Sequence, residues 1–170
     1  MTAPWRARAH FRLFSLCTAG RTTGGLLFEI GALYEHIAFY LECLRASLGP
    51  RVPLRVSIAN LAKDTQHQAA LSAIIETLRH TFPDVKIESD KGRKDAGDYY
   101  GGFRFHISAT SADDEELELV DGGDTDWTQK LMNNAKERLV MRGIGTERVC
   151  GNFAPVAHRS TAKSNGRRSH

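Results

Sequence analysis

The stretch "DAGDYYGGFRFHISATSADDEELELVDGGDTDW", residues 95–127, contains two segments in which apolar and polar residues alternate. "FRFHIS" (103–108) and "ELELV" (116–120) have the period of two that is typical of strands with one buried face. The polar connection "ATSADDE" (109–115) joins them as a hairpin. Because a hairpin excludes a purely parallel sheet, the fold class is α/β or α+β, with a mixed, mostly antiparallel sheet flanked by helices.

Apolar spacing also predicts the elements on either side of this hairpin. We expect strands at 11–17, 53–60 and 84–90, a turn or loop at 18–25, and helices at about 30–48, 64–82 and 126–140. In the last helix, Asp126 is the expected N-cap, and Leu131, Met132 and Ala135 are expected to face the core. These elements predict one domain over residues 11–155. A basic extension precedes it at 1–10, and a basic tail at 156–170 has too few apolar residues to offset the entropy of ordering.

The composition narrows the class of protein. At 170 residues and 41% hydrophobic content, the chain is long enough for one domain with a core. It has no run of about 18 apolar residues that would cross a membrane, so we expect a soluble protein. Cys17, Cys43 and Cys150 are scattered and form no CxxC pair, which argues against disulfides and zinc and favours the cytoplasm. The basic, acid-free start can also be a transit peptide, but residues 11–16 read more readily as a strand.

Two glycine pairs are candidates for a ligand site. Gly122 and Gly123 follow a strand and precede the expected helix, where backbone can approach a ligand and N–H groups favour an anion. A strand-to-helix turn needs glycine for its dihedral angles as well, so this pattern has two readings. The other pair is Gly101 and Gly102. Tyr99 and Tyr100 precede it and offer two hydroxyls beside bare backbone, as in the floor of a small polar pocket. Aromatic packing at the start of a strand is the alternative.

Near the C-terminal end, "GIGTERV" (143–149) does not fit the dinucleotide pattern GxGxxG or the phosphate-binding pattern GxxxxGK[ST]. Arg148 can stack on a purine or pair with phosphate oxygens, or it is a solvated charge at the start of a helix. The histidines lack HxxxH or HExxH spacing, and Ser108 and Ser111 lack the context of a nucleophile elbow. Metal sites and hydrolase chemistry are therefore disfavoured.

In their order along the chain, these pieces resemble the catalytic core of histidyl-tRNA synthetase, a class II aminoacyl-tRNA synthetase, and of its non-catalytic relatives. "DYYGGFRFHI" resembles the family segment D-Y-Y-T-G-x-x-F-E, with matches at Asp98, Tyr99, Tyr100, Gly102 and Phe105. "DGGDTDW" resembles G-G-R-Y-D-G, with matches at Gly122, Gly123 and Asp126. "GIGTERV" resembles class II motif 3, A-x-G-x-E-R-L, with matches at Ile144, Gly145, Glu147 and Arg148. The resemblance covers about residues 11–150, and its upstream part is similar to the end of motif 2.

The resemblance implies a ligand site and its chemistry. The implied amino-acid pocket comprises Tyr99, Tyr100, Gly102, Gly122, Gly123 and Asp126. The implied ATP-binding residues are Gly145, Glu147 and Arg148. Histidine is the expected amino acid, and ATP with magnesium are the implied cofactors. If the chain is active, its reaction would be ATP-dependent amino-acid activation, in which positioning and electrostatics stabilise the charge that develops.

The departures from the family fall on charged positions. Asp95 stands where the family has an arginine, and Asp124 and Thr125 stand where it has Arg and Tyr. Leu16 and Gly20 stand where motif 2 has Gln and Glu. Replacing arginine by aspartate reverses the interaction with an anion. No counterpart of motif 1 or of an anticodon-binding domain is recognisable, so we expect a truncated or catalytically inactive paralogue that binds an amino acid, ATP or both, with catalytic residues unknown.

Three other functions stay open. The first is a regulatory protein like the synthetase-related subunit of ATP phosphoribosyltransferase. The second is a nucleic-acid-associated module, since both chain ends are basic while the loop at 109–118 is acidic, although a short basic tail supports only weak, salt-sensitive contact with RNA. The third is an active fragment that needs a partner chain. A homodimer is also compatible with the sequence.

Overall fold

The computed structural model describes residues 12–92 and 99–153. Its strands are β1 (Leu13–Arg21), β2 (Leu54–Asn60), β3 (Lys86–Ser89), β4 (Phe103–Thr110), β5 (Glu116–Thr125) and β6 (Glu137–Gly145). Its helices are α1 (Leu27–Leu48), α2 (Thr65–Thr81), α3 (Trp127–Met132) and α4 (Thr146–Phe153). The expected basic extension and basic tail lie outside the described residues.

The six strands form one sheet in the order β1-β6-β5-β4-β2-β3. All neighbours are antiparallel except β2 and β3, which are parallel. The predicted fold class, a mixed and mostly antiparallel sheet flanked by helices, is therefore confirmed. The hairpin of β4 and β5 lies inside the sheet, where each of its strands has a second neighbour.

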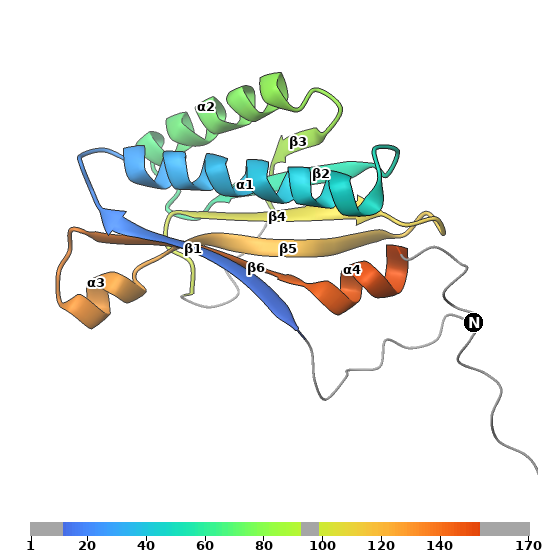
Figure 1. Ribbon diagram of the computed structural model, residues 1–170. Coiled ribbons are helices and arrows are strands. Elements are labelled where there is room, and N and C mark those ends of the chain that lie inside the picture. Colours follow the sequence, from blue (N-terminus) through green and yellow to red (C-terminus); the bar gives the residue numbers. More distant parts are fainter. Residues whose placement is uncertain (1–11, 93–98, 154–170) are drawn as a thin grey trace, which may run out of the picture.

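Helices α1 and α2 pack on one face of the sheet, as Figure 1 shows. The predicted apolar stripes of both helices are buried here, among them Leu33 and Leu41 of α1 and Leu71 of α2. They meet alternate residues of the central strands, such as Phe105 and Ile107. Removing these apolar side chains from water is the main favourable contribution to folding, at roughly 25 cal/mol for each Å² buried.

The opposite face of the sheet, called the open face below, carries the other set of alternate residues. Arg104 pairs with Gly123, and Asp121 pairs with His106, so these residues lie on the side away from Phe105. The short helix α3 contacts β6, and the described residues show α1 and α2 packed on the other face. Polar side chains of the central strands are therefore available on this face. No helix in the described part of the chain is long and apolar enough to cross a membrane.

The structure corrects the prediction for residues 122–140. Gly122 and Gly123 lie within β5, which continues to Thr125, instead of forming a strand-to-helix turn. The expected long helix is only α3, because Asn133 adopts a left-handed conformation with φ 47° and ends it. The chain then forms β6 between β1 and β5.

The side chains expected to face the core from this helix do not do so. Leu131 is 82% exposed and Met132 is 65% exposed, and Ala135 is also exposed. Strand β1 is also longer than predicted, because it includes residues 18–21, which were expected to be a loop. In both regions the long-range pairing of β1 with β6 overrides the local sequence preference. The other predicted helices, strands and the hairpin are confirmed within a few residues of their expected ends.

Candidate functional site

Tyr100 lies on the open face, where its ring covers Gly123 of β5. A Cβ atom on Gly123 would lie 2.7 Å from Tyr100 Cδ1 and 2.2 Å from the carbonyl oxygen of Phe103. Real Cβ atoms do not approach other atoms so closely. Gly123 is therefore required for the close packing of the aromatic ring on the strand.

Tyr100 belongs to an aromatic cluster with Tyr99 and Trp127. The ring centroids of Tyr99 and Tyr100 are 4.8 Å apart, and those of Tyr99 and Trp127 are 5.2 Å apart, both in edge-on geometry. The Tyr99 hydroxyl donates to Met141 Sδ at 3.5 Å. Because Tyr99 is 39% exposed and Trp127 is 45% exposed, part of this aromatic surface is accessible to a ligand.

Asp121 provides the polar half of the same site. Its carboxylate accepts a hydrogen bond from the Tyr100 hydroxyl at 3.1 Å and from Arg104 Nε at 2.9 Å and Nη2 at 3.2 Å. The Arg104 guanidinium also lies 5.3 Å from the centre of the Tyr100 ring, within cation–π range. We call Tyr99, Tyr100, Arg104, Asp121 and Trp127 the open-face cluster.

Burial and charge fix the protonation of this cluster. Burial, and then the carboxylate of Asp121, raise the pKa of Tyr100 well above its ordinary value. Burial alone would lower the pKa of Arg104, but the hydrogen bond and charge of Asp121 outweigh it and raise that pKa. At neutral pH Tyr100 therefore keeps its phenolic proton and Arg104 keeps its charge, and both donate to the side chain of Asp121.

These groups are suited to binding rather than to proton transfer. The carboxylate can attract an ammonium group, the tyrosines can donate and accept hydrogen bonds, and the exposed rings can pack on a flat ring. In the described chain, no three His, Cys, Asp or Glu side chains are placed to hold a metal ion.

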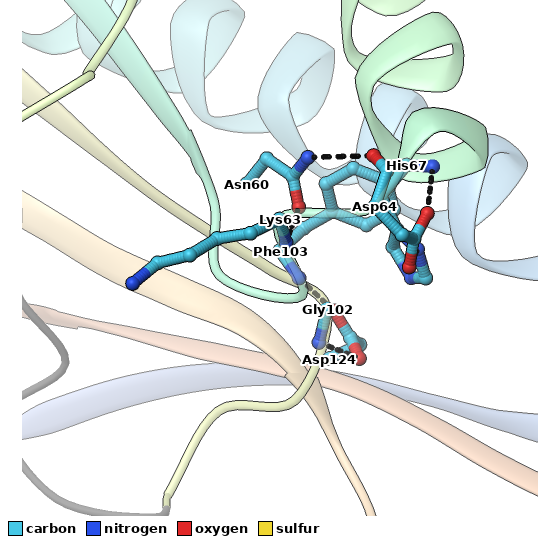
Figure 2. Close-up of polar contacts among 7 residues, drawn as sticks. All are labelled: Asn60, Lys63, Asp64, His67, Gly102, Phe103 and Asp124. Carbon is cyan, nitrogen blue, oxygen red and sulfur yellow. Dashed lines mark hydrogen bonds and ion pairs between the residues drawn. The ribbon is translucent and has the colours of Figure 1, made fainter.

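Asp124 and Gly102, which the sequence placed near the pocket, have contacts of their own (Figure 2). The Asp124 carboxylate accepts hydrogen bonds from the backbone N–H groups of Gly102 and Phe103. A Cβ atom on Gly102 would lie 2.5 Å from Nε2 of His67, which leans on this turn from α2. Burial raises the pKa of Asp124 despite these N–H groups. The hydrogen bonds of the Asp124 carboxylate thus support the backbone at the start of β4.

The six implied pocket residues are therefore divided between environments. Tyr99, Tyr100 and Gly123 meet on the open face, and Asp126 begins α3 beside Trp127, where it forms an ion pair with Lys130 at 2.8 Å. Gly122 lies on the α1 side instead, since a Cβ atom there would lie 2.3 Å from Cβ of Arg142. Gly102 packs against His67. Asp95 and Asp98 lie outside the described residues.

The three implied ATP-binding residues lie at the junction of β6 and α4. Both carboxylate oxygens of Glu147 accept the backbone N–H of Arg12 at 2.8 Å, and this bond is the main reason that the pKa of Glu147 is lowered. Glu147 therefore fixes the start of β1. The exposed guanidinium of Arg148 donates from Nη1 to the carbonyl oxygen of Glu118. Gly145 has open space around it, so no close approach requires a glycine there.

Sequence reasoning missed Arg104, Asp121 and Trp127. The alternation in the hairpin places Arg104 and Asp121 on the face opposite Phe105, so the sequence does indicate that they share a face. Their pairing also depends on the strand register, which shifts between Ile107 and Ser108. No local pattern indicates that Trp127 packs on Tyr99.

No protein-family model and no curated protein matches the chain. Solved structures do, and one is the histidyl-tRNA synthetase of S. aureus in its apo form, with TM-score 0.60 and 15% identity over 82% of this chain and 38% of that chain. Another is the RNA-binding domain of threonyl-tRNA synthetase from Cryptosporidium parvum Iowa II, with TM-score 0.59 and 14% identity over 84% of this chain and 37% of that chain. The chain thus spans less than two fifths of either neighbour's length. At these identities the likeness concerns the fold alone, and the six-stranded sheet with its flanking helices is similar to the class II synthetase fold.

Proposed function

We propose that this chain is a histidyl-tRNA synthetase-like domain that binds a free amino acid, ATP or both at the open-face cluster, and that it does not activate amino acids by itself. The observation that carries the proposal is the arrangement around Asp121. A partly exposed carboxylate, a phenol and a guanidinium converge beside accessible aromatic rings. They do so on the face of the sheet that α1 and α2 leave uncovered.

The cluster suits an amino acid with an aromatic side chain. The side chain of Asp121 is 35% exposed, so its carboxylate can meet an α-ammonium group while it still accepts from Arg104. Tyr99 and Trp127 offer ring faces and edges to an imidazole or another flat ring. Among flat-ring amino acids, histidine is the first candidate, because the chain's fold neighbours include a histidyl-tRNA synthetase.

ATP fits this face less completely. The aromatic rings can pack on adenine, whereas a triphosphate needs several cations. Arg104 is already bound to Asp121, and Arg55 forms ion pairs with Glu88 and Glu116. Arg148 donates to a backbone carbonyl and has an exposed guanidinium, so it is the residue that we assign to a phosphate. We propose that any ATP is bound with its magnesium, which screens the phosphate charge.

Isothermal titration calorimetry with histidine, ATP with magnesium, and a non-hydrolysable histidyl-adenylate analogue tests the proposal. We expect at least one of these ligands to bind with a Kd below 1 mM, and Asp121→Asn or Tyr100→Phe to weaken it about tenfold, the loss of one charge-assisted or neutral hydrogen bond. Glu88→Gln is the matched control, because this carboxylate belongs to the separate ion pair with Arg55. If none of the three ligands binds below millimolar concentration, the proposed function is wrong.

A further inference from the structure

The two edge strands of the sheet, β1 and β3, differ in how they are protected. Strand β3 has four residues, two of which are the charged Lys86 and Glu88. Strand β1 has nine residues, with no proline or lysine, and it pairs with β6 without a register shift. Short length, lysine, proline and bulges are the usual devices that prevent an edge strand from pairing with another chain. Strand β1 has none of them.

The hydrogen bonds at the two ends of β1 show which backbone groups face the free edge. Thr22 donates its N–H to Lys136, and Thr146 donates its N–H to the carbonyl of Arg12. In an antiparallel pair, residues with bonds to the neighbouring strand alternate with residues whose N–H and C=O groups point away. The even-numbered residues of β1 therefore bond to β6. The outward-pointing groups are those of Leu13, Ser15, Cys17, Ala19 and Arg21, and none of them has a backbone partner among the described residues.

The side chains at this edge are also unusually apolar for a solvent-facing strand. Leu13 is 58% exposed and Phe14 is 46% exposed. Phe14 stacks on Phe39 of α1, with ring centroids 6.2 Å apart, and Phe39 is itself 41% exposed. The one charged residue of the strand, Arg21, is paired with Glu137. The edge thus combines free backbone groups with an exposed apolar patch that extends over the α1 side.

We propose that β1 pairs antiparallel with β1 of a second copy of this chain, about a two-fold axis perpendicular to the sheet, so that one continuous sheet runs through both copies. A second copy is the occupant because an antiparallel strand pair of this kind is self-complementary, with the same surface on both partners. The register that pairs all nine residues of β1 sets Cys17 opposite Cys17 of the second copy. Every outward N–H and C=O of both strands then has a partner.

The side chains favour the same register. It sets Phe14 opposite Gly20 of the second copy, on the face that carries α1. Gly20 has no side chain, and the Phe28 ring covers it so closely that a Cβ atom would lie 2.6 Å from Phe28 Cε2. The exposed Phe14 ring would therefore pack beside the Phe28 ring of the second copy, over the smallest residue of the strand. Both α1 helices lie on the same face of the continuous sheet, next to the axis.

The mass of the full chain in solution, measured by light scattering and sedimentation over a concentration series, tests the pairing. We expect a dimer that dissociates on dilution. Cys17→Lys places two ammonium groups opposite each other at the axis, so it should weaken dimerisation at least tenfold. Leu131→Lys, on the exposed surface of α3, should leave the dimer unchanged. A chain that is monomeric throughout, or a dimer unaffected by Cys17→Lys, overturns the proposal.

Cross-linking tests the register independently. In hydrogen-bonded antiparallel pairs, opposite Cα atoms are about 5.5 Å apart, within the range that a disulfide spans. In a Cys43→Ser, Cys150→Ser background, the added oxidant diamide should therefore link two copies through Cys17. Moving the thiol with Cys17→Ser and Ala19→Cys should abolish the link, because residue 19 then faces Ser15. Equal cross-linking in both variants would reject this register.

Discussion

Arg142 lies on β6 with its side chain turned toward α1, and it is only 2% exposed. Its guanidinium lies 5.2 Å from the centre of the Tyr40 ring and 5.4 Å from that of Phe105. None of its three side-chain nitrogens has a hydrogen-bond partner among the described residues. Burial lowers the pKa of Arg142 to about 9, which still leaves the group charged at pH 7. Among the described residues, the core therefore contains a cation in contact with two aromatic rings and without a hydrogen-bond acceptor.

Replacing this cation should stabilise the protein. An unpaired buried charge costs several kcal/mol, whereas each cation–π contact returns at most about 2 kcal/mol. We expect Arg142→Met, which keeps the apolar stem of the side chain and removes the charge, to raise the free energy of unfolding by about 1–3 kcal/mol in urea denaturation. Arg55→Met, which removes a half-exposed arginine of the open face, should change it by less than about 1 kcal/mol. A clear loss of stability in Arg142→Met would mean that the guanidinium has a partner, such as a buried water or anion.

At the start of α2, the surroundings of Asp64 favour its charged form, whereas burial disfavours the charged form of Arg142. Its side chain accepts the backbone N–H of His67, and this bond is the main reason that the pKa of Asp64 is lowered. A carboxyl group whose pKa is lower in the folded state stabilises the fold above its unfolded pKa of about 3.9, and this contribution disappears as the pH falls through the folded pKa. The helix cap is thus sensitive to acid.

The substitution Asp64→Asn separates the cap from its charge. Asparagine caps helices as well as aspartate does, so the variant should fold normally at pH 7. In thermal unfolding from pH 7 to pH 2.5, the native protein should have a higher Tm than Asp64→Asn at neutral pH. This difference in Tm should vanish in acid. Asp64→Ala has no acceptor and should be less stable than Asp64→Asn at every pH. Parallel curves for the native protein and Asp64→Asn would contradict the assigned cause.

At the scale of single elements, β5 depends on glycine where the aromatic ring of Tyr100 covers it. Gly123→Ala would bring a Cβ atom within 2.2 Å of Phe103 O and 2.7 Å of Tyr100 Cδ1, so either the strand or the ring must move. Such overpacking typically costs about 1–3 kcal/mol. We expect a loss of this size in urea denaturation, together with a change in the near-ultraviolet dichroism of the tyrosine and tryptophan cluster.

Gly145 on β6 provides the matched control. A Cβ atom there has no heavy atom within 4 Å, and its φ is not in the left-handed region. Gly145→Ala should therefore be neutral or slightly stabilising, by up to about 1 kcal/mol, because alanine reduces the freedom of the unfolded chain. If the two alanine variants are equally stable, the ring of Tyr100 does not lie on β5 as described.

The elements that were predicted correctly from the sequence are those with a clear local pattern of apolar residues. The stripe of Leu33, Ile37 and Leu41 identifies α1, and the alternation in "FRFHIS" identifies β4. Residues 126–140 have apolar spacing that is compatible with a helix, yet β6 forms there because it pairs with β1, more than a hundred residues earlier, and with β5. For the same reason the sequence indicated Tyr99 and Tyr100 but not their partners, since the contact of Tyr100 with Asp121 depends on strand register.

At the scale of the whole molecule, the sheet separates two tasks. The α1–α2 face holds the apolar core, and the open face holds the Arg104–Asp121 ion pair and the aromatic cluster. On the open face, the arginines of the central and edge strands already have acidic partners: Arg104 with Asp121, Arg55 with Glu88 and Glu116, and Arg21 with Glu137. Amino-acid activation develops negative charge on phosphate, and stabilising that charge requires cations that are free to meet it. The described part of this face offers binding groups but little free positive charge.

The small amount of free positive charge on this face predicts that the chain alone does not form an aminoacyl-adenylate. ATP–pyrophosphate exchange with histidine, measured at saturating ATP and magnesium, should not exceed the background without protein, while the S. aureus histidyl-tRNA synthetase serves as the positive control. Asp121→Asn should not create exchange, because it removes the negative charge beside Arg104 without placing that guanidinium on a phosphate. Histidine-dependent exchange by the purified chain would show that free cations do reach the phosphates, and the proposed inactivity would then be wrong. Binding measured by calorimetry without exchange would instead separate the two parts of the proposal, with the open-face cluster retained as a ligand site and the chemistry absent.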